Sequence, residues 1–208
     1  MKQLLLDIQP VPAPTLANFV PGRNQEALLA LSRAAAGEAD SRFVYLWGLP
    51  GCGKSHPLTA VLRAAANGIR LEIADDVHLL NEAAQIALFD RYNRLRDSGG
   101  VLVASGSASP MQMSLRDDLA TRLAWGLVYQ LQPLSDEEKA QALATHAAER
   151  GMRLPAEVVE YCLRHLRRDL PTLMATLDAL DIWSLTAKKP VTVPMLRQLL
   201  QLPLDLQQ

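Results

Sequence analysis

Short apolar runs and longer amphipathic stretches alternate along the first two thirds of the chain. The short runs are β-prone and bounded by turn residues, and they predict strands at 43–47, 69–74, 101–104 and 127–131. Stretches of helical periodicity separate them and predict a helix capped by Asn24 and closed by Gly37, a helix over 57–66, and a helix over 82–97 capped by Asn81. Strands that alternate with helices in this way indicate a parallel sheet with helices on its faces.

The pattern changes after Pro133, where no further strand is predicted. Ser135 and Glu138 have the spacing of a capping box and open a helix that extends to about Arg150. Further signals predict three more helices: Pro155 at a first turn, Asp169 as a cap, and Thr192 with Pro194. We therefore expect an α/β unit over 14–132 and a helical unit over 133–208.

Residues 1–13 differ from both units. The proline-rich stretch Pro10–Pro14 cannot be helical and predicts an extended tether behind residues 1–9. Asp7 and Pro10 interrupt the apolar start of the chain too early for a signal peptide, and no apolar run reaches the 18 or so residues of a membrane span. The expected location is the cytoplasm, with no membrane contact.

Composition and charge exclude several classes of protein. The chain has 208 residues, of which 49% are hydrophobic, and it carries 21 Lys and Arg against 22 Asp and Glu. This composition excludes a disordered or collagenous chain, and the balanced charge excludes a bulk electrostatic grip on nucleic acid. Cys52 and Cys162 lie far apart, which argues against a disulfide framework or a zinc site and indicates a reducing compartment.

The segment Gly48-Leu49-Pro50-Gly51-Cys52-Gly53-Lys54-Ser55 has the complete G-x-x-x-x-G-K-S spacing. It lies between a predicted strand and a predicted helix, as a P-loop does. Its glycines allow backbone N–H groups to turn toward phosphate oxygens, Lys54 reaches the outer phosphates, and the Ser55 hydroxyl is a magnesium ligand. The predicted nucleotide-binding residues here are Pro50, Gly51, Cys52, Gly53, Lys54, Ser55 and His56.

A pair of carboxylates follows the second predicted strand. Asp75 is predicted to hold Mg²⁺ together with Ser55, and Asp76 to orient or activate a water. The third predicted strand leads into Ser105-Gly106-Ser107, for which a contact with the γ-phosphate and a plain loop are both open interpretations.

Five blocks of sequence then carry a resemblance to the DnaA-homologous AAA+ ATPases. These are Pro14–Asn24, Asp75–His78, Ile86–Arg94, Thr121–Gly126 and Gln132–Lys139, and three of them resemble regulatory members of the family more closely than the initiators. The resemblance implies an AAA+ core with strand order 5-1-4-3-2 and a C-terminal helical lid. It also implies that Phe19 and Val20 lie against the adenine of bound ADP or ATP.

The resemblance also implies partners. Residues 3–8 are similar to the motif by which such regulators bind the DNA polymerase sliding clamp, with Gln3, Leu4, Leu6 and Ile8 as contact residues. Arg122 matches the arginine that acts in trans on ATP bound to DnaA. One alternative is that Arg122 is a surface residue paired with Asp117 or Asp118. Another is that Arg116 is the arginine that acts in trans, which is called an arginine finger.

Three departures from the family pattern change the expectation. Only 20 residues separate Lys54 from Asp75, which leaves no room for the family's additional strand and helix, so the sheet is predicted to have four strands and to lack the outer edge strand. Pro171 stands where the family has a nucleotide-sensing arginine, which leaves Arg168 or Arg167 as a substitute. Ser107 stands where the family has an aspartate after the third strand. Together the three departures argue for weak turnover in the chain's own site.

The expected function is therefore regulation of replication initiation, by clamp binding and by promoting hydrolysis of DnaA-bound ATP. The absence of a helix-turn-helix module after the lid favours a regulator without direct sequence-specific DNA binding. The alternatives are an autonomous AAA+ ATPase of the helicase-loader or initiator type, a small-molecule P-loop kinase, and a clamp adaptor with a purely structural P-loop. Homo-oligomerisation is open.

Overall fold

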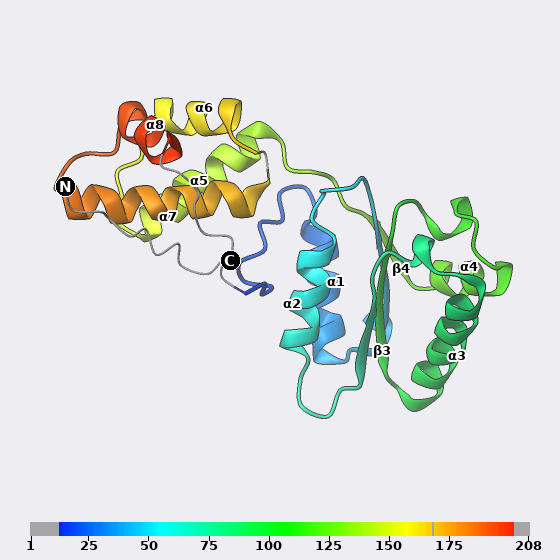
Figure 1. Cartoon of the computed structure of the whole chain (residues 1–208). Coiled ribbons are helices and arrows are strands. Elements are labelled where there is room, and N and C mark those ends of the chain that lie inside the picture. Colours follow the sequence, from blue (N-terminus) through cyan, green and yellow to red (C-terminus); the bar gives the residue numbers. More distant parts are fainter. Residues whose placement is uncertain (1–12, 168, 202–208) are drawn as a thin grey trace, which may run out of the picture. The chain divides into compact units, whose positions relative to one another are not determined.

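The computed structural model describes residues 13–167 and 169–201, which divide into two compact units at residues 134 and 135. The α/β unit contains α1 (Gln25–Ala36), β1 (Phe43–Trp47), α2 (Ser55–Ala64), β2 (Leu71–Ala74), α3 (Glu82–Ser98), β3 (Val101–Gly106), α4 (Asp117–Ala124) and β4 (Leu127–Gln130). The helical unit contains α5 (Asp136–Glu149), α6 (Ala156–His165), α7 (Leu170–Ala187) and α8 (Val193–Gln201). Both are drawn in Figure 1.

The sheet has four parallel strands in the order β2-β3-β1-β4. This confirms the prediction of a four-stranded parallel sheet. The link between α2 and β2 is a tight turn in which the Ala66 N–H donates to Ala35 O at 2.9 Å and the Ile69 N–H donates to Ala66 O at 3.0 Å. Because Ile69 belongs to this turn, β2 starts at Leu71, two residues later than predicted.

Side chains of β1 alternate between two apolar layers. Val44 and Leu46 are buried on one face with residues of α1 and α2, whereas Tyr45 is buried on the other with residues of α3 and α4. Figure 1 shows the two helix pairs on opposite sides of the strands. A parallel sheet covered on both faces explains why its strands read as continuous apolar runs.

Three of the four predicted helix caps are confirmed. The side chains of Asn81 and Asp169 accept hydrogen bonds from backbone N–H groups of the first turn, and Ser135 forms a capping box with Glu138. Asn24 occupies the predicted N-cap position of α1, but its side chain makes no cap hydrogen bond. Its buried amide donates to Gln132 O at 2.9 Å and accepts from the Gln132 N–H at 2.7 Å, because the end of β4 offers it two backbone partners.

Several short elements were not predicted. Helix α4 has only 8 residues. Two acidic side chains in its first turn interact favourably with the positive end of the helix dipole, but Arg116, the residue before the helix, makes no side-chain cap. The 3-10 turns η1 (Ala39–Ser41), η2 (Val77–Leu79) and η3 (Pro110–Gln112) are shorter still. Turns of three residues are too short to have a periodic signal of their own.

The helical unit packs around its own apolar core, with Leu143, Val158, Cys162, Leu173, Leu177 and Leu196 fully or nearly fully buried. Polar contacts join α5 and the residue after it to α7: His146 Nε2 lies 2.7 Å and Arg150 Nη1 3.2 Å from Asp178 Oδ1. Across both units, within the described ranges, no helix is long and apolar enough to cross a membrane.

Candidate nucleotide site and arginine surface

The predicted P-loop follows the carboxyl end of β1 and leads into α2. Gly51 and Gly53 have φ values of 79° and 92°, which residues with a side chain rarely adopt. A Cβ on Gly48 would lie 2.6 Å from Leu131 O and 2.9 Å from Cys52 Sγ, so the start of the loop has no room for a side chain. The glycines therefore permit a tight turn whose N–H groups precede the N-terminus of a 10-residue helix, as phosphate binding requires.

Lys54 is the buried cation of this loop, with 9% of its surface exposed. Its ammonium donates to Gly48 O at 2.9 Å and to Leu49 O at 3.3 Å. Two carbonyl dipoles thus hold the charge inside the loop. Ser55, the first residue of α2, is exposed and leaves its hydroxyl at the helix N-terminus.

Asp75 and Asp76 follow the carboxyl end of β2, next to β3. The Ser105 hydroxyl, at the end of β3, donates to Asp75 Oδ1, and the Asp76 N–H donates to Asp75 Oδ1 at 3.0 Å and to Ser105 Oγ at 3.1 Å. Asp75 Oδ2 accepts no hydrogen bond from the residues that the structure describes. An oriented carboxylate with an open oxygen fits a magnesium ligand.

From its sequence context alone, Ser105 could be either a site residue or part of a plain loop. The structure places it on β3, fully buried, where it contacts the predicted metal ligand. A polar residue at the end of an otherwise apolar strand was the available signal. Ser107, two residues on, is exposed, and its hydroxyl lies 4.0 Å from Met113 Sδ.

Asp76 adopts the left-handed region, with φ 47° and ψ 50°. Aspartate tolerates this conformation better than most residues. Its carboxylate lies 3.9 Å from His78 Nδ1, and it contributes, after burial, to raising the pKa of Tyr45 far above the ordinary value. The Tyr45 hydroxyl therefore stays protonated and donates to Ala108 O at 3.0 Å.

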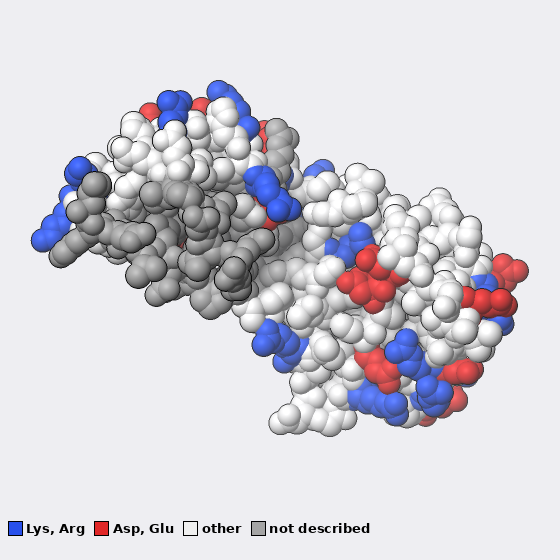
Figure 2. All heavy atoms as spheres, in the orientation of Figure 1, with Lys and Arg blue, Asp and Glu red and all other residues white. Residues whose placement is uncertain are grey.

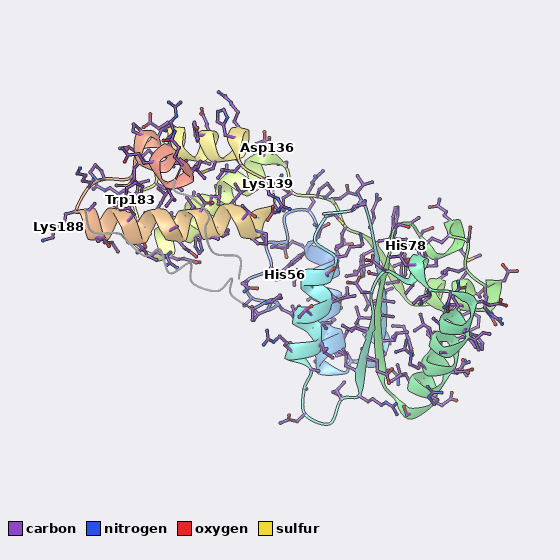
Figure 3. All side chains as sticks on the ribbon, in the orientation of Figure 1. His56, His78, Asp136, Lys139, Trp183 and Lys188 are labelled. Carbon is purple, nitrogen blue, oxygen red and sulfur yellow. The ribbon has the colours of Figure 1, made fainter. Side chains whose placement is uncertain are left out.

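Phe19, which was predicted to lie against the adenine, contacts His56 near the start of α2. The rings of Phe19 and His56 lie 5.5 Å apart, and His56 Nε2 donates to Thr15 O at 3.2 Å. Thr15 and Asn18 hold the entry segment in a turn through reciprocal bonds between backbone N–H groups and side-chain oxygens. Figure 3 shows His56 on α2, across the strands from His78.

Arg122 lies on α4 at the other end of the sheet. It lines a small cavity with Phe43 and Val44, the first two residues of β1, whereas the P-loop follows Trp47, the last residue of that strand. Those ends are about 13 Å apart at the usual strand rise. The structure therefore does not bring Arg122 to the chain's own P-loop.

The carboxylates considered as partners of Arg122 are placed differently. Asp118 pairs with Arg116, whose Nη2 lies 2.9 Å from Asp118 Oδ2, and this hydrogen bond lowers the pKa of Asp118. Arg122 instead stacks on Trp125, its guanidinium carbon 4.3 Å from the ring centroid, with Phe89 at 6.0 Å. In the part of the chain that the structure describes, Arg122 forms no ion pair.

Two groups of predicted residues lie outside the described ranges. These are Arg168 and the clamp-contact residues Gln3, Leu4, Leu6 and Ile8. Nearby, Pro171 is in the first turn of α7, and Arg167 Nε lies 3.5 Å from Asp169 Oδ2.

Within residues 13–167 and 169–201, no three His, Cys, Asp or Glu side chains converge as a metal site would. Magnesium in nucleotide sites needs no such cluster, because one or two protein ligands act together with phosphates and waters. On the face shown in Figure 2, basic and acidic side chains of the α/β unit are interspersed.

Comparison with known proteins identifies a fold for the chain and a family match for its helical unit. Residues 136–200 match the family model described as "Hda, lid domain". Domain III of DnaA from Thermotoga maritima aligns with a TM-score of 0.70 at 23% identity, over 92% of this chain and 98% of that one. AMPPCP-bound DnaA from Aquifex aeolicus aligns with a TM-score of 0.67 at 19% identity, over 85% of this chain and 70% of that one. A Thermotoga maritima RuvB variant aligns with a TM-score of 0.63 at 15% identity, over 92% of this chain and 72% of that one.

The α/β unit with its P-loop, followed by a lid, therefore has the AAA+ fold of DnaA domain III, as predicted. At these identities the structural likeness concerns the fold, and the lid match concerns residues 136–200. The helical unit is similar to the lid domain of Hda, and the whole chain has the fold of DnaA domain III.

Proposed function

We propose that this protein binds ADP or ATP with Mg²⁺ and promotes hydrolysis of ATP held by a DnaA-type partner. The observation that carries the proposal is the position of Arg122. Its guanidinium has no carboxylate partner among the described residues and lies at the end of β1 opposite the P-loop. A cation so placed can serve a phosphate on a neighbouring molecule.

The chain's own site is assigned as follows. Lys54 and the backbone of Gly51–Gly53 bind the phosphates, and Phe19, Val20 and His56 lie beside the base. Ser55 and Asp75 would hold the magnesium ion, which neutralises phosphate charge when bound. Asp76 orients water at this site, and Arg168 on the lid is the substitute for the family's sensor arginine.

In the partner's site, Arg122 acts on the leaving γ-phosphoryl group. Charge spreads over the equatorial oxygens of this group in the transition state, and a permanently charged guanidinium stabilises it. A finger supplied in trans is worth on the order of 10³–10⁵ in rate. The test is DnaA-ATP hydrolysis with and without this protein and clamp loaded on DNA.

The decisive variant is Arg122→Ala. We expect it to fold, to bind nucleotide and clamp, and to lose stimulation of DnaA-ATP hydrolysis. Arg116→Ala is the matched control, because Arg116 is on the same segment but bound to Asp118. Full stimulation by Arg122→Ala, or its loss only in Arg116→Ala, would show that Arg122 is not the finger. Fast hydrolysis by this protein alone would favour the autonomous ATPase instead.

Clamp binding is assigned to residues 3–8, with Gln3, Leu4, Leu6 and Ile8 as contacts, as an extended peptide laid into an apolar pocket. Deletion of residues 1–9 should abolish binding to the sliding clamp in a pull-down and leave nucleotide affinity unchanged. Gln3→Ala with Leu6→Ala should reproduce the deletion, whereas Lys2→Ala should not. Binding that survives the deletion would exclude this motif.

A further inference from the structure

Trp125 is an unusual neighbour for a candidate arginine finger. It follows α4 directly, 66% of its surface is exposed, and its ring lies 4.3 Å from the guanidinium carbon of Arg122. That distance is well within the range of about 6 Å over which an aromatic face attracts a cation. Phe89, on α3, is at the limit of that range, at 6.0 Å.

The stack exists although carboxylates are available nearby. Asp117 and Asp118 lie on the same helix as Arg122, and all three line a surface hollow of about 320 Å³ with Trp125. Asp118 is engaged by Arg116 through two hydrogen bonds, of 2.9 and 3.2 Å. The arrangement therefore gives one arginine a carboxylate and the other an aromatic face.

These two ways of holding an arginine have different chemical consequences. A carboxylate occupies the in-plane N–H groups that would otherwise bind a phosphate. An aromatic ring contacts only the face of the guanidinium and leaves its in-plane donors available. Stacking also restricts a side chain that otherwise has many rotamers.

We propose that Trp125 is a positioning residue, which holds the guanidinium of Arg122 in the orientation that it uses on the partner's γ-phosphate. This inference rests on the proposed function of Arg122. Trp125 itself need not contact the nucleotide. Its contribution is to hold Arg122 in place before the partner binds, and so it should affect the maximal rate more than the affinity between the proteins.

The first experiment measures DnaA-ATP hydrolysis against the concentration of this protein. Trp125→Leu, which keeps apolar bulk without an aromatic face, should lower the maximal stimulated rate about tenfold and leave the half-maximal concentration within twofold. Trp125→Phe should recover most of the rate. Leu29→Ala, which removes another exposed apolar side chain of the α/β unit, should match the wild type.

Three results would overturn the proposal. A full maximal rate with Trp125→Leu would show that the stack has no role, and a raised half-maximal concentration with an unchanged maximal rate would make Trp125 a docking contact. Equal losses in Trp125→Leu and Trp125→Phe would likewise exclude positioning by an aromatic face.

A second measurement does not depend on the partner. The Nε–H resonance of Arg122, assigned by its loss in Arg122→Lys, should be shifted by the indole ring, and the shift should vanish in Trp125→Leu and remain in part in Trp125→Phe. An unshifted wild-type resonance would overturn the stack. A shifted resonance in a protein that stimulates no hydrolysis would refute the proposed function and, with it, any use of the stack in catalysis.

Discussion

The two ends of β1 present a cation under opposite conditions. At the carboxyl end, Lys54 is buried, and its ammonium donates to two carbonyls of its own loop. At the amino end, Arg122 is half-buried, and its guanidinium lies against aromatic rings with no ion pair among the described residues. A buried ammonium surrounded by its own loop serves a ligand within that loop, whereas a stacked guanidinium at the surface can serve another molecule.

The largest expected effect is on ADP affinity, which a change at one end of β1 should weaken and a change at the other end should not. Lys54→Ala should weaken ADP binding about 100-fold, because it removes the charged donor from the phosphate site. Arg122→Ala should leave ADP affinity within twofold, because its end of the sheet is about 13 Å away. Titration with a fluorescent ADP analogue in Mg²⁺ measures both. Equal weakening in the two variants would show that the ends are not independent.

A charge-conserving exchange sharpens the comparison. Lys54→Arg should weaken ADP binding about tenfold, since a planar fork cannot occupy the compact position between two carbonyls, and Arg122→Lys should lower stimulated hydrolysis about tenfold, since an ammonium lacks both the stacking face and the fork. Each loss is expected in one assay only, measured with the same protein preparation. Wild-type behaviour of either variant would mean that charge alone suffices at that end.

Ser105, near the carboxyl end of β3, is expected to make a smaller contribution to magnesium-dependent nucleotide binding. Ser105→Ala removes the hydroxyl that orients Asp75, and we expect the Mg²⁺ concentration needed for half-maximal ADP binding to rise about fivefold. ADP binding without Mg²⁺ should not change. Ser107→Ala, at an exposed serine two residues away, is the control, and a response equal to that of Ser105→Ala would argue against a specific role.

The smallest expected effect concerns the two cysteines. Burial raises the pKa of the Cys162 thiol to about 11, so at pH 8 only about one in a thousand of these thiols is ionised and alkylation should be very slow. Cys52, half-buried in the P-loop, should be alkylated faster, and ADP with Mg²⁺ should slow its labelling severalfold. Peptide mass spectrometry after iodoacetamide treatment separates the sites. Labelling of Cys52 that ignores ADP would place the nucleotide elsewhere.

The elements with a strong local signal were predictable from sequence. The strand at 43–47 and the caps at Asn81, Ser135 and Asp169 rest on apolar runs and short-range hydrogen bonds, and the structure has them as predicted. The four-stranded sheet followed from counting residues between Lys54 and Asp75.

What sequence could not provide were partners chosen by the tertiary structure. Asn24 has the residue type and position of a helix cap, yet its side chain bonds Gln132. Asp118 is a plausible partner for Arg122 on the same helix, but Arg116 occupies it, and Trp125 takes its place. Ser105 belongs to an apolar strand, and only the pairing of β3 with β2 brings it to Asp75.

The Asn24 bridge has a consequence for the order of events during synthesis. It joins the first helix of the α/β unit to a residue 108 positions later, and the neighbouring Arg23 donates to Pro133 O at 3.0 Å. Such contacts form only when both segments have left the ribosome, and long-range contacts of this kind slow folding. The α/β unit therefore cannot close until residue 133 has emerged, although the P-loop is complete 78 residues earlier, at Ser55.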